Sequence, residues 1–293
     1  WLKFLNEATN GDADLIRFLQ QFVGYSLTGR VSEHALLFIY GPGGNGKSVF
    51  LNTVSAILGD YCRTSAMDTF IASNNDRHPT DLAMLAGARM VCASETEEGR
   101  SWAESRIKQL TGGDKIAARF MRQDFFEFFP QFKMMIIGNH KPRLTNVTEA
   151  VRRRFNIIPF IHTPKTIDQD LEQNLRAEWP GILRWMIDGC LDWQKNGLIR
   201  AQVVIDTTQE YFSEQDVVRR WADDCCEMVP TFWEKSGTLY LSWKTWCDQN
   251  GEKPNTSKWF GTQLARLNCT PSNRARNGRG WKGIGLVDQL GNR

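Results

Sequence analysis

The sequence contains no pair of cysteines in C-x-x-C spacing, and its seven cysteines are scattered along the chain. An odd, dispersed set argues against a disulfide framework and against a zinc site, because both use cysteines in matched groups. Such a set is typical of reduced thiols inside a cell. The sequence therefore predicts a cytoplasmic protein.

Long apolar runs are also missing. No stretch is long enough to span a bilayer, no signal peptide opens the chain, and no internal repeat or low-complexity segment is present. We therefore expect no membrane partner. The net charge of +3 neither requires nor excludes a nucleic-acid partner, so the distribution of charge matters more than its sum. The first residue is Trp1 rather than Met, and we expect a fragment with a further domain before it.

One motif carries the strongest signal. Residues 41–48 match G-x-x-x-x-G-K-[ST] at every fixed position, between an apolar run at 35–40 and a predicted helix. The glycines let backbone N–H groups face phosphates at a helix N-terminus, and the lysine and serine suit phosphate and Mg²⁺. The sequence therefore predicts a site for ATP and Mg²⁺. Its expected residues are Gly41, Pro42, Gly43, Gly44, Asn45, Gly46, Lys47, Ser48 and Val49, with the Ser48 hydroxyl as a metal ligand.

Hydrophobic patterning divides the 293 residues into segments, and 41% hydrophobic content supports about two domains. Helical spacing characterises residues 1–30 and 166–210. Between them, over 31–165, apolar strands alternate with helices, which predicts an α/β core with a parallel sheet. The expected strands are 35–40, 89–94, 133–138 and 155–160. Residues 211–293 form the expected second domain.

Polar side chains follow two of these strands. Glu95 and Glu97 come after the strand at 89–94, where a carboxylate can hold Mg²⁺ through water and activate the attacking water. We favour Glu95, the first residue beyond the apolar run, as the metal ligand; the alternative is a solvated acidic loop. Asn139 follows the strand at 133–138 and can sense the γ-phosphate, and the alternative is an ordinary turn residue.

Three consecutive arginines, residues 152–154, precede the last expected strand. They cannot all face one way, so at least one projects from the body. A projecting guanidinium suits transition-state charge on a neighbouring subunit's nucleotide, and the candidates are Arg153 and Arg154. The alternative is a solvated basic face.

Residues 115–120 and 125–129 are predicted to form the two arms of a hairpin. Its phenylalanines are expected to lie mostly in the core. Its basic residues are equally consistent with a surface role and with contacts to a nucleic-acid backbone. The candidate DNA-binding residues here are Lys115, Arg119 and Arg122.

The C-terminal segment has the order of a winged helix: three predicted helices, with a Ser213–Asp216 capping box before the first, and a terminal hairpin around Asn277-Gly278. Residues 254–293 hold seven basic residues against one acidic residue, a net charge of +6. We expect the aromatic side chains to form a small core and about half of the arginines to contact DNA. The candidates are Lys258, Arg274, Arg276 and Arg279.

Together these motifs resemble the superfamily 3 helicase domain of the phage and plasmid primase-helicases, which are related to the poxvirus-type primase-helicase. The resemblance covers nearly the whole chain. Its motifs are the phosphate loop, Ser94-Glu95-Thr96-Glu97-Glu98, Leu110-Thr111-Gly112-Gly113-Asp114, Gly138-Asn139-His140-Lys141-Pro142 and Arg153-Arg154.

The resemblance implies an AAA+-like ATPase that encircles single-stranded DNA at a replication fork as a ring, usually a hexamer. It implies that Glu95 is the Walker B acid, Asn139 the sensor, and Arg153 or Arg154 the arginine acting across the subunit interface. An upstream primase module and, for a viral source, the host cytoplasm are implied too. Many members have two adjacent acids where this chain has Ser94-Glu95, which leaves the roles of Glu95 and Glu97 open.

The sequence thus predicts an ATP-dependent DNA helicase. Two other classes remain: an ATP-dependent initiator or loader that binds DNA without unwinding it, and a P-loop kinase that acts on a small molecule. The kinase would need neither the arginines nor the basic C-terminal segment.

Overall fold

The computed structural model describes residues 1–72, 80–95, 99–144, 147–164, 166, 168–274 and 278–287. The chain divides into two compact units, Trp1–Phe212 and Ser213–Arg293. The expected boundary at residue 211 lies beside this division. The segments 1–30 and 166–210, which were expected to be helical, belong to the same compact unit as the sheet. No helix among the described residues is both long and apolar enough to cross a membrane.

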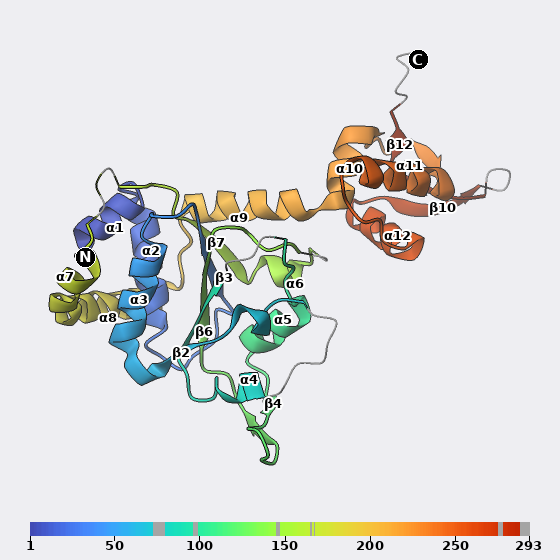
Figure 1. The fold of residues 1–293 in the computed structure, drawn as a ribbon. Helices are drawn as coiled ribbons and strands as arrows, with labels where there is room; N and C mark the ends of the chain where they lie inside the picture. Colours follow the sequence, from blue (N-terminus) through green and yellow to red (C-terminus); the bar gives the residue numbers. More distant parts are fainter. Residues whose placement is uncertain are drawn as a thin grey trace. The chain divides into compact units, whose positions relative to one another are not determined.

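The first unit is an α/β structure built on a five-stranded parallel sheet in the order β2-β3-β6-β1-β7 (Figure 1). The strands are β1 Leu36–Tyr40, β2 Cys62–Thr64, β3 Met90–Glu95, β6 Lys133–Gly138 and β7 Phe155–Pro159. The four expected strands are confirmed within a residue or so at their ends. Strand β2 was missed, because three residues that are largely accessible to solvent carry no periodic apolar pattern.

Helices cover both faces of this sheet (Figure 1). Alternate strand residues supply the two cores: Leu37 and Ile39 face one, and Leu36 and Phe38 the other. The first face carries α1 Leu2–Ala8, α2 Ala13–Tyr25, α3 Lys47–Leu58, α7 Leu171–Ala177 and α8 Trp179–Asn196. The second carries α4 Thr80–Ala83, α5 Glu104–Gly112, α6 Glu149–Arg152 and the end of α9 Gln202–Gln215. Two single turns of 3-10 helix, Gly59–Tyr61 and Met67–Thr69, complete the unit.

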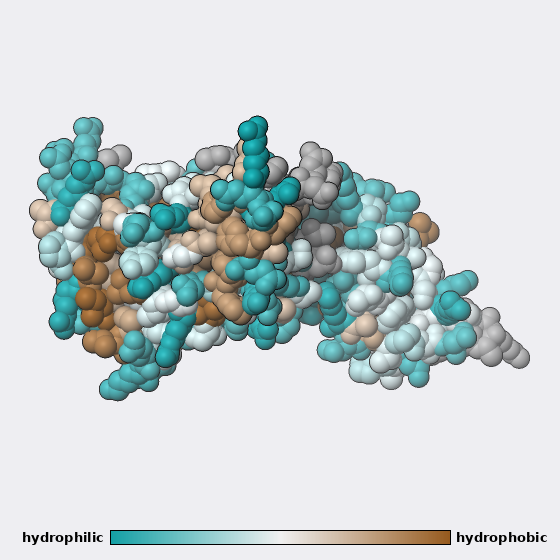
Figure 2. All heavy atoms as spheres, turned by 90° about the horizontal axis from the view of Figure 1, so that it is seen from below, coloured by the Kyte–Doolittle hydropathy of each residue, from teal (hydrophilic) through white to brown (hydrophobic). Residues whose placement is uncertain are grey.

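The predicted hairpin is present as β4 Ile116–Ala118 and β5 Phe126–Phe128, and it projects from the body of the unit (Figure 1). The expectation for its phenylalanines was wrong, because Phe120, Phe125 and Phe129 are 41%, 62% and 60% exposed. They flank strands of only three residues, so they lie beyond the reach of the core. Figure 2 shows brown side chains with teal ones over this hairpin.

The second unit contains α10 Val217–Cys225, α11 Ser236–Gln249 and α12 Ser257–Arg266, followed by the predicted hairpin of β10 Thr270–Arg274 and β11 Gly278–Lys282. Strand β9 Trp233–Lys235 joins this hairpin, and β8 Cys226–Glu227 pairs with β12 Gly285–Leu286. A separate aromatic core holds the unit together. The expected capping box was wrong: Ser213 lies inside α9, and Asp216 alone caps α10 by accepting a hydrogen bond from the Arg219 amide.

Candidate nucleotide-binding site

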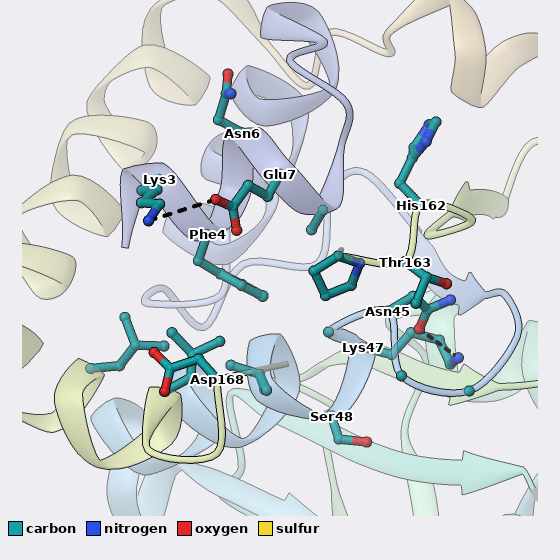
Figure 3. A pocket seen from close by; sticks show the side chains of 18 of the residues that line it. Lys3, Phe4, Asn6, Glu7, Asn45, Lys47, Ser48, His162, Thr163 and Asp168 are labelled. Carbon is teal, nitrogen blue, oxygen red and sulfur yellow. Dashed lines mark hydrogen bonds and ion pairs between the residues drawn. The ribbon is translucent and has the colours of Figure 1, made fainter. Parts of the chain in front are cut away.

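A cavity of about 1360 Å³ opens at the carboxyl ends of the parallel strands (Figure 3). The phosphate loop, the end of β3 at Ser94 and the end of β6 at Gly138 and Asn139 form part of its wall. Helix α1, the segment after β7 and helix α7 form most of the rest. Ligands of open α/β sheets bind outside the carboxyl ends of the strands, so the cavity lies where the fold places such sites.

The phosphate loop connects β1 to α3, which begins at Lys47. Gly46 has φ of 85°, a left-handed conformation that favours glycine. At Gly41 the limit is space: a Cβ there would lie 1.9 Å from the carbonyl oxygen of Phe160, at the end of the neighbouring strand β7. These two positions explain why the loop needs glycine, independently of any ligand.

Lys47 is 6% exposed, and its ammonium lies within the loop. Its Nζ donates to the carbonyl oxygens of Gly41 at 2.6 Å and Pro42 at 2.8 Å, and to Asn45 Oδ1 at 2.9 Å (Figure 3). Asn45 in turn donates through Nδ2 to the carbonyl oxygen of Phe160. Burial lowers the pKa of Lys47 from its ordinary value, so a bound anion would stabilise the charged form.

Two hydroxyls and one amide lie near the loop. Ser48, Ser94 and Asn139 line the cavity, and all three are exposed to solvent. Glu95 pairs with Gly138 in the sheet, so its backbone lies beside the end of β6, directly before Asn139. The Ser48 hydroxyl suits Mg²⁺, which prefers oxygen ligands. The Glu95 side chain and the whole of Glu97 lie outside the described residues, so their carboxylate roles stay predictions.

The three arginines have three different surroundings. The Arg152 guanidinium lies 5.0 Å from the centre of the Phe212 ring. Arg154 is 7% exposed, and its guanidinium donates to Thr111 Oγ1 and to the carbonyl oxygen of Ala150. Since that guanidinium is held inside its own subunit, the geometry does not fit Arg154 as a residue that reaches a neighbour.

Arg153 is exposed, and no hydrogen bond or ion pair joins its guanidinium to another described residue. It does not line the cavity. None of the described residues that do line it is an arginine. The described wall of the cavity therefore contains no arginine, whereas the exposed Arg153 lies outside that wall.

The candidate DNA-binding residues of the hairpin lie together. Lys115 pairs with Glu127 at 3.0 Å, the Arg119 guanidinium lies 4.8 Å from the centre of the Phe125 ring, and Arg122 is exposed at the tip. In the second unit, Lys258 on α12 and Arg279 on β11 are exposed. The side chain of Arg274 and the whole of Arg276 lie outside the described residues.

Several cavity residues were missed from the sequence. Helix α1 contributes Phe4 and Glu7, and the segment after β7 contributes His162, Thr163 and Asp168 (Figure 3). His162 and Thr163 follow a core strand, so the reasoning that singled out Asn139 would also have found them. Helix α1 carries no such signal, because only the tertiary packing brings it to the loop.

Comparison with known proteins finds similarity in the part of the chain that holds the phosphate loop. Residues 39–154, which contain the phosphate loop and the arginines, match the model of a family described as a family of unknown function, DUF5906. Over 271 residues the chain is 25% identical to the protein named "Putative helicase L207/L206" of Acanthamoeba polyphaga mimivirus, covering 83% of this chain and 28% of that protein. Over 130 residues it is 27% identical to "Putative helicase 121R" of Invertebrate iridescent virus 3, covering 42% and 14%.

Among solved structures, two of the NrS-1 C-terminal region match with TM-scores of 0.58 and identities of 11% and 12%, covering 97% of this chain and 75% of theirs. This likeness shows a shared fold. The chain spans only 28% and 14% of the lengths of the viral relatives. A phosphate loop on a parallel α/β sheet is thus set in a chain that is similar to viral proteins named as helicases and that shares the fold of the NrS-1 C-terminal region.

Proposed function

We propose that this chain is the ATPase motor of an ATP-dependent DNA helicase of the superfamily 3 type, acting in phage, plasmid or viral replication. One observation carries the proposal. A phosphate loop faces a cavity in whose described wall no arginine lies, and an exposed arginine, Arg153, stands elsewhere on the same chain. A ring of identical subunits would bring the two together.

The loop residues supply the binding half of the site. The Lys47 ammonium would leave the loop carbonyls and contact the β- and γ-phosphates, while loop N–H groups bind phosphate oxygens at the start of α3. Bound Mg²⁺, held by Ser48 with Glu95, would neutralise charge on the β- and γ-oxygens. Glu95 or Glu97 would accept the proton of the attacking water, and Asn139 would orient that water.

The neighbouring subunit would complete the site. Arg153 would place its guanidinium against the γ-phosphate, where negative charge is spread over the oxygens in the transition state. Hydrolysis would then depend on assembly, and nucleotide binding would not. A closed ring also gives each subunit the same two surfaces, one with the loop and one with the arginine.

The hairpin of β4 and β5 would contact the DNA strand inside the ring. Its exposed phenylalanines offer faces for base stacking, and Arg119 and Arg122 offer charge for the backbone. Such contacts do not depend on sequence and weaken with salt. The second unit, with Lys258 and Arg279 exposed, would add contacts to the fork in the manner of a winged helix.

The test measures ATPase rate against protein concentration, with and without single-stranded DNA, together with strand displacement on a forked duplex. We expect a DNA-stimulated rate that rises more than linearly with concentration. Lys47→Ala should lower the rate by at least about 100-fold, because it removes a charge aimed at the transferred phosphoryl group.

The matched control is Lys195→Ala, an exposed lysine on α8 that does not line the cavity. It should leave the rate unchanged. A rate that is indifferent to DNA and linear in concentration would contradict the ring motor and favour a monomeric phosphotransferase. ATP binding and DNA binding without strand displacement would favour an initiator or loader.

A further inference from the structure

Arg154, the residue that follows Arg153, makes a buried polar contact. The Arg154 Nε donates to Thr111 Oγ1 at 2.9 Å, and its NH1 donates to the carbonyl oxygen of Ala150 at 2.6 Å. Arg154 and Thr111 are only 7% and 4% exposed. The Thr111 hydroxyl donates in turn to the carbonyl oxygen of Ile107 at 2.6 Å. The Thr111 hydroxyl therefore accepts a hydrogen bond from the buried Arg154 guanidinium while it donates its own proton to Ile107.

Thr111 is anchored from a second side. Its carbonyl oxygen lies 2.7 Å from Nδ1 of His34, two residues before β1 begins at Leu36. Thr111 also lies in the last turn of α5, which ends at Gly112. The contact between Arg154 and Thr111 thus joins the arginine segment to α5 and to the entrance of the central strand. None of these elements is adjacent to the arginines in sequence.

The backbone of the arginine segment is restrained at several further points. The Arg153 amide donates to the carbonyl oxygen of Glu149 at 3.1 Å, and the Arg153 carbonyl oxygen accepts from Arg200 at 2.7 Å. The carbonyl oxygen of Arg154 accepts from the Leu36 amide at 2.7 Å. Restraint of this kind fixes where the exposed Arg153 side chain leaves the surface.

We propose that Thr111 and Arg154 are positioning residues that hold Arg153 in the geometry required at the neighbouring subunit's nucleotide. The proposal rests on the proposed function. Small displacements of a catalytic group are costly, since an error of 1 Å can lower a rate by about 100-fold. A buried guanidinium that loses its hydroxyl acceptor also has an unsatisfied N–H group. The Arg154 side chain would then shift to reach another acceptor or water, and this shift would displace Arg153.

The test compares Thr111→Val, which removes the hydroxyl at nearly constant volume, with Thr111→Ser, which keeps it. We expect Thr111→Val to lower kcat for ATP hydrolysis by about 10- to 100-fold and to leave the Kd for a fluorescent ATP analogue unchanged. Thr111→Ser should restore most of the rate. Arg154→Lys, which keeps the charge but loses the two-point contact, should behave like Thr111→Val.

The decisive measurement is a double-mutant cycle on kcat with Arg153→Ala. If Thr111 acts through Arg153, Thr111→Val should have little effect on kcat in the Arg153→Ala background. Thr208→Val provides the control, because Thr208 is also buried, at 8% exposure, and its hydroxyl accepts a hydrogen bond from a backbone amide, that of Ile157, rather than from an arginine. It should lower thermal stability without lowering kcat.

Two results would overturn the proposal while leaving the proposed function intact. One is an unchanged kcat in Thr111→Val. The other is a double variant whose kcat falls by the product of the two single effects, which indicates a general structural role. An Arg153→Ala variant with undiminished DNA-stimulated ATPase activity would overturn both this proposal and the proposed role of Arg153 at the neighbouring subunit's nucleotide.

Discussion

Individual residues of the phosphate loop are constrained by packing against their neighbours in this chain as well as by the requirements of phosphate binding. The end of β7 touches the loop at two points, since Gly41 faces the Phe160 carbonyl oxygen and Asn45 donates to it. The loop is therefore packed against the edge strand of the sheet. The segment that continues from that strand, His162 and Thr163, lines the cavity.

Replacing Gly41 with alanine should destabilise the protein even without nucleotide. The new Cβ would lie 1.9 Å from the Phe160 carbonyl oxygen, and a backbone atom cannot move aside cheaply. We expect a loss of about 1–3 kcal/mol, measured as a lower midpoint of thermal unfolding. Gly43→Ala is the matched control, because a Cβ at that position would have no atom within 4 Å apart from those of its chain neighbours. Equal stabilities of the two variants would contradict this account of Gly41.

The Cys62 thiol should react with iodoacetamide at unusually low pH. The Cys92 thiol, whose Sγ lies 3.4 Å from the Cys62 Sγ, and the Ser55 hydroxyl each share a hydrogen bond with the Cys62 thiol, and they lower the pKa of Cys62 to about 7 against the cost of burial. Because the thiolate is the nucleophile, the alkylation rate should rise through pH 7 instead of near pH 9. In Cys92→Ala the rise should move to higher pH. If the midpoint of the alkylation rate stays at about pH 7 in that variant, a group other than Cys92 lowers the pKa of Cys62.

At the scale of elements, the hairpin of the first unit exposes its side chains, whereas helix α9 packs against the sheet. The hairpin of β4 and β5 projects from the body (Figure 1) and exposes phenylalanine and arginine side chains. Helix α9 packs against the sheet: Thr208 accepts from the Ile157 amide, and Tyr211 accepts from Trp102 Nε1 and donates to the Pro142 carbonyl oxygen. Helix α9 thus contacts β7 and the segment that follows β6.

Removing one exposed hairpin ring should weaken binding to single-stranded DNA. A stacked base is worth about 1–3 kcal/mol, so Phe125→Ala should raise the Kd by about 5- to 150-fold. Leu191→Ala is the control, since Leu191 on α8 is 56% exposed, close to the 62% of Phe125. The measurement is fluorescence anisotropy with a labelled oligonucleotide at fixed salt. Equal affinities of the two variants would show that the Phe125 ring is not part of the DNA interface.

At the scale of the whole molecule, the separation of Lys47 from Arg153 is the main consequence of the fold. One residue is buried in the phosphate loop, and the other is exposed away from the cavity that the loop faces. In the proposed ring, a single chain would therefore present two halves of a site. Activity would then be a property of the assembly, and the rate would depend on protein concentration.

Mixing two inactive variants should restore activity. Lys47→Ala subunits lack the phosphate-binding lysine but keep Arg153. Arg153→Ala subunits lack that arginine but keep an intact phosphate loop. In a ring assembled from equal amounts of both, about a quarter of the sites combine an intact loop with an intact arginine. The measurement is ATPase rate against mixing ratio, with a maximum near equal amounts. A rate that stays at the level of the two separate variants would place both residues in one subunit's site.

Much of the fold could be predicted because its signals are local. Buried parallel strands have continuous apolar runs, and four of the five were found from these. Strand β2 and the exposed phenylalanines were misjudged, since short segments carry too few residues for periodicity to distinguish a core face from a surface. Helix α1 was predicted as a helix, but its place at the cavity depends on packing with residues far away in sequence.

The sequence alone determined the phosphate loop, the strands around it and the polar residues at the strand ends, because glycine conformation, hydrophobic periodicity and strand-end geometry are properties of short segments. Tertiary structure decided which arginine faces outward. Arg153 and Arg154 are indistinguishable as neighbours in a sequence, and only the fold brings Thr111 to within 2.9 Å of Arg154 and leaves Arg153 at the surface. Burial of a charged side chain requires specific partners, and these come from segments that the chain connects only by folding.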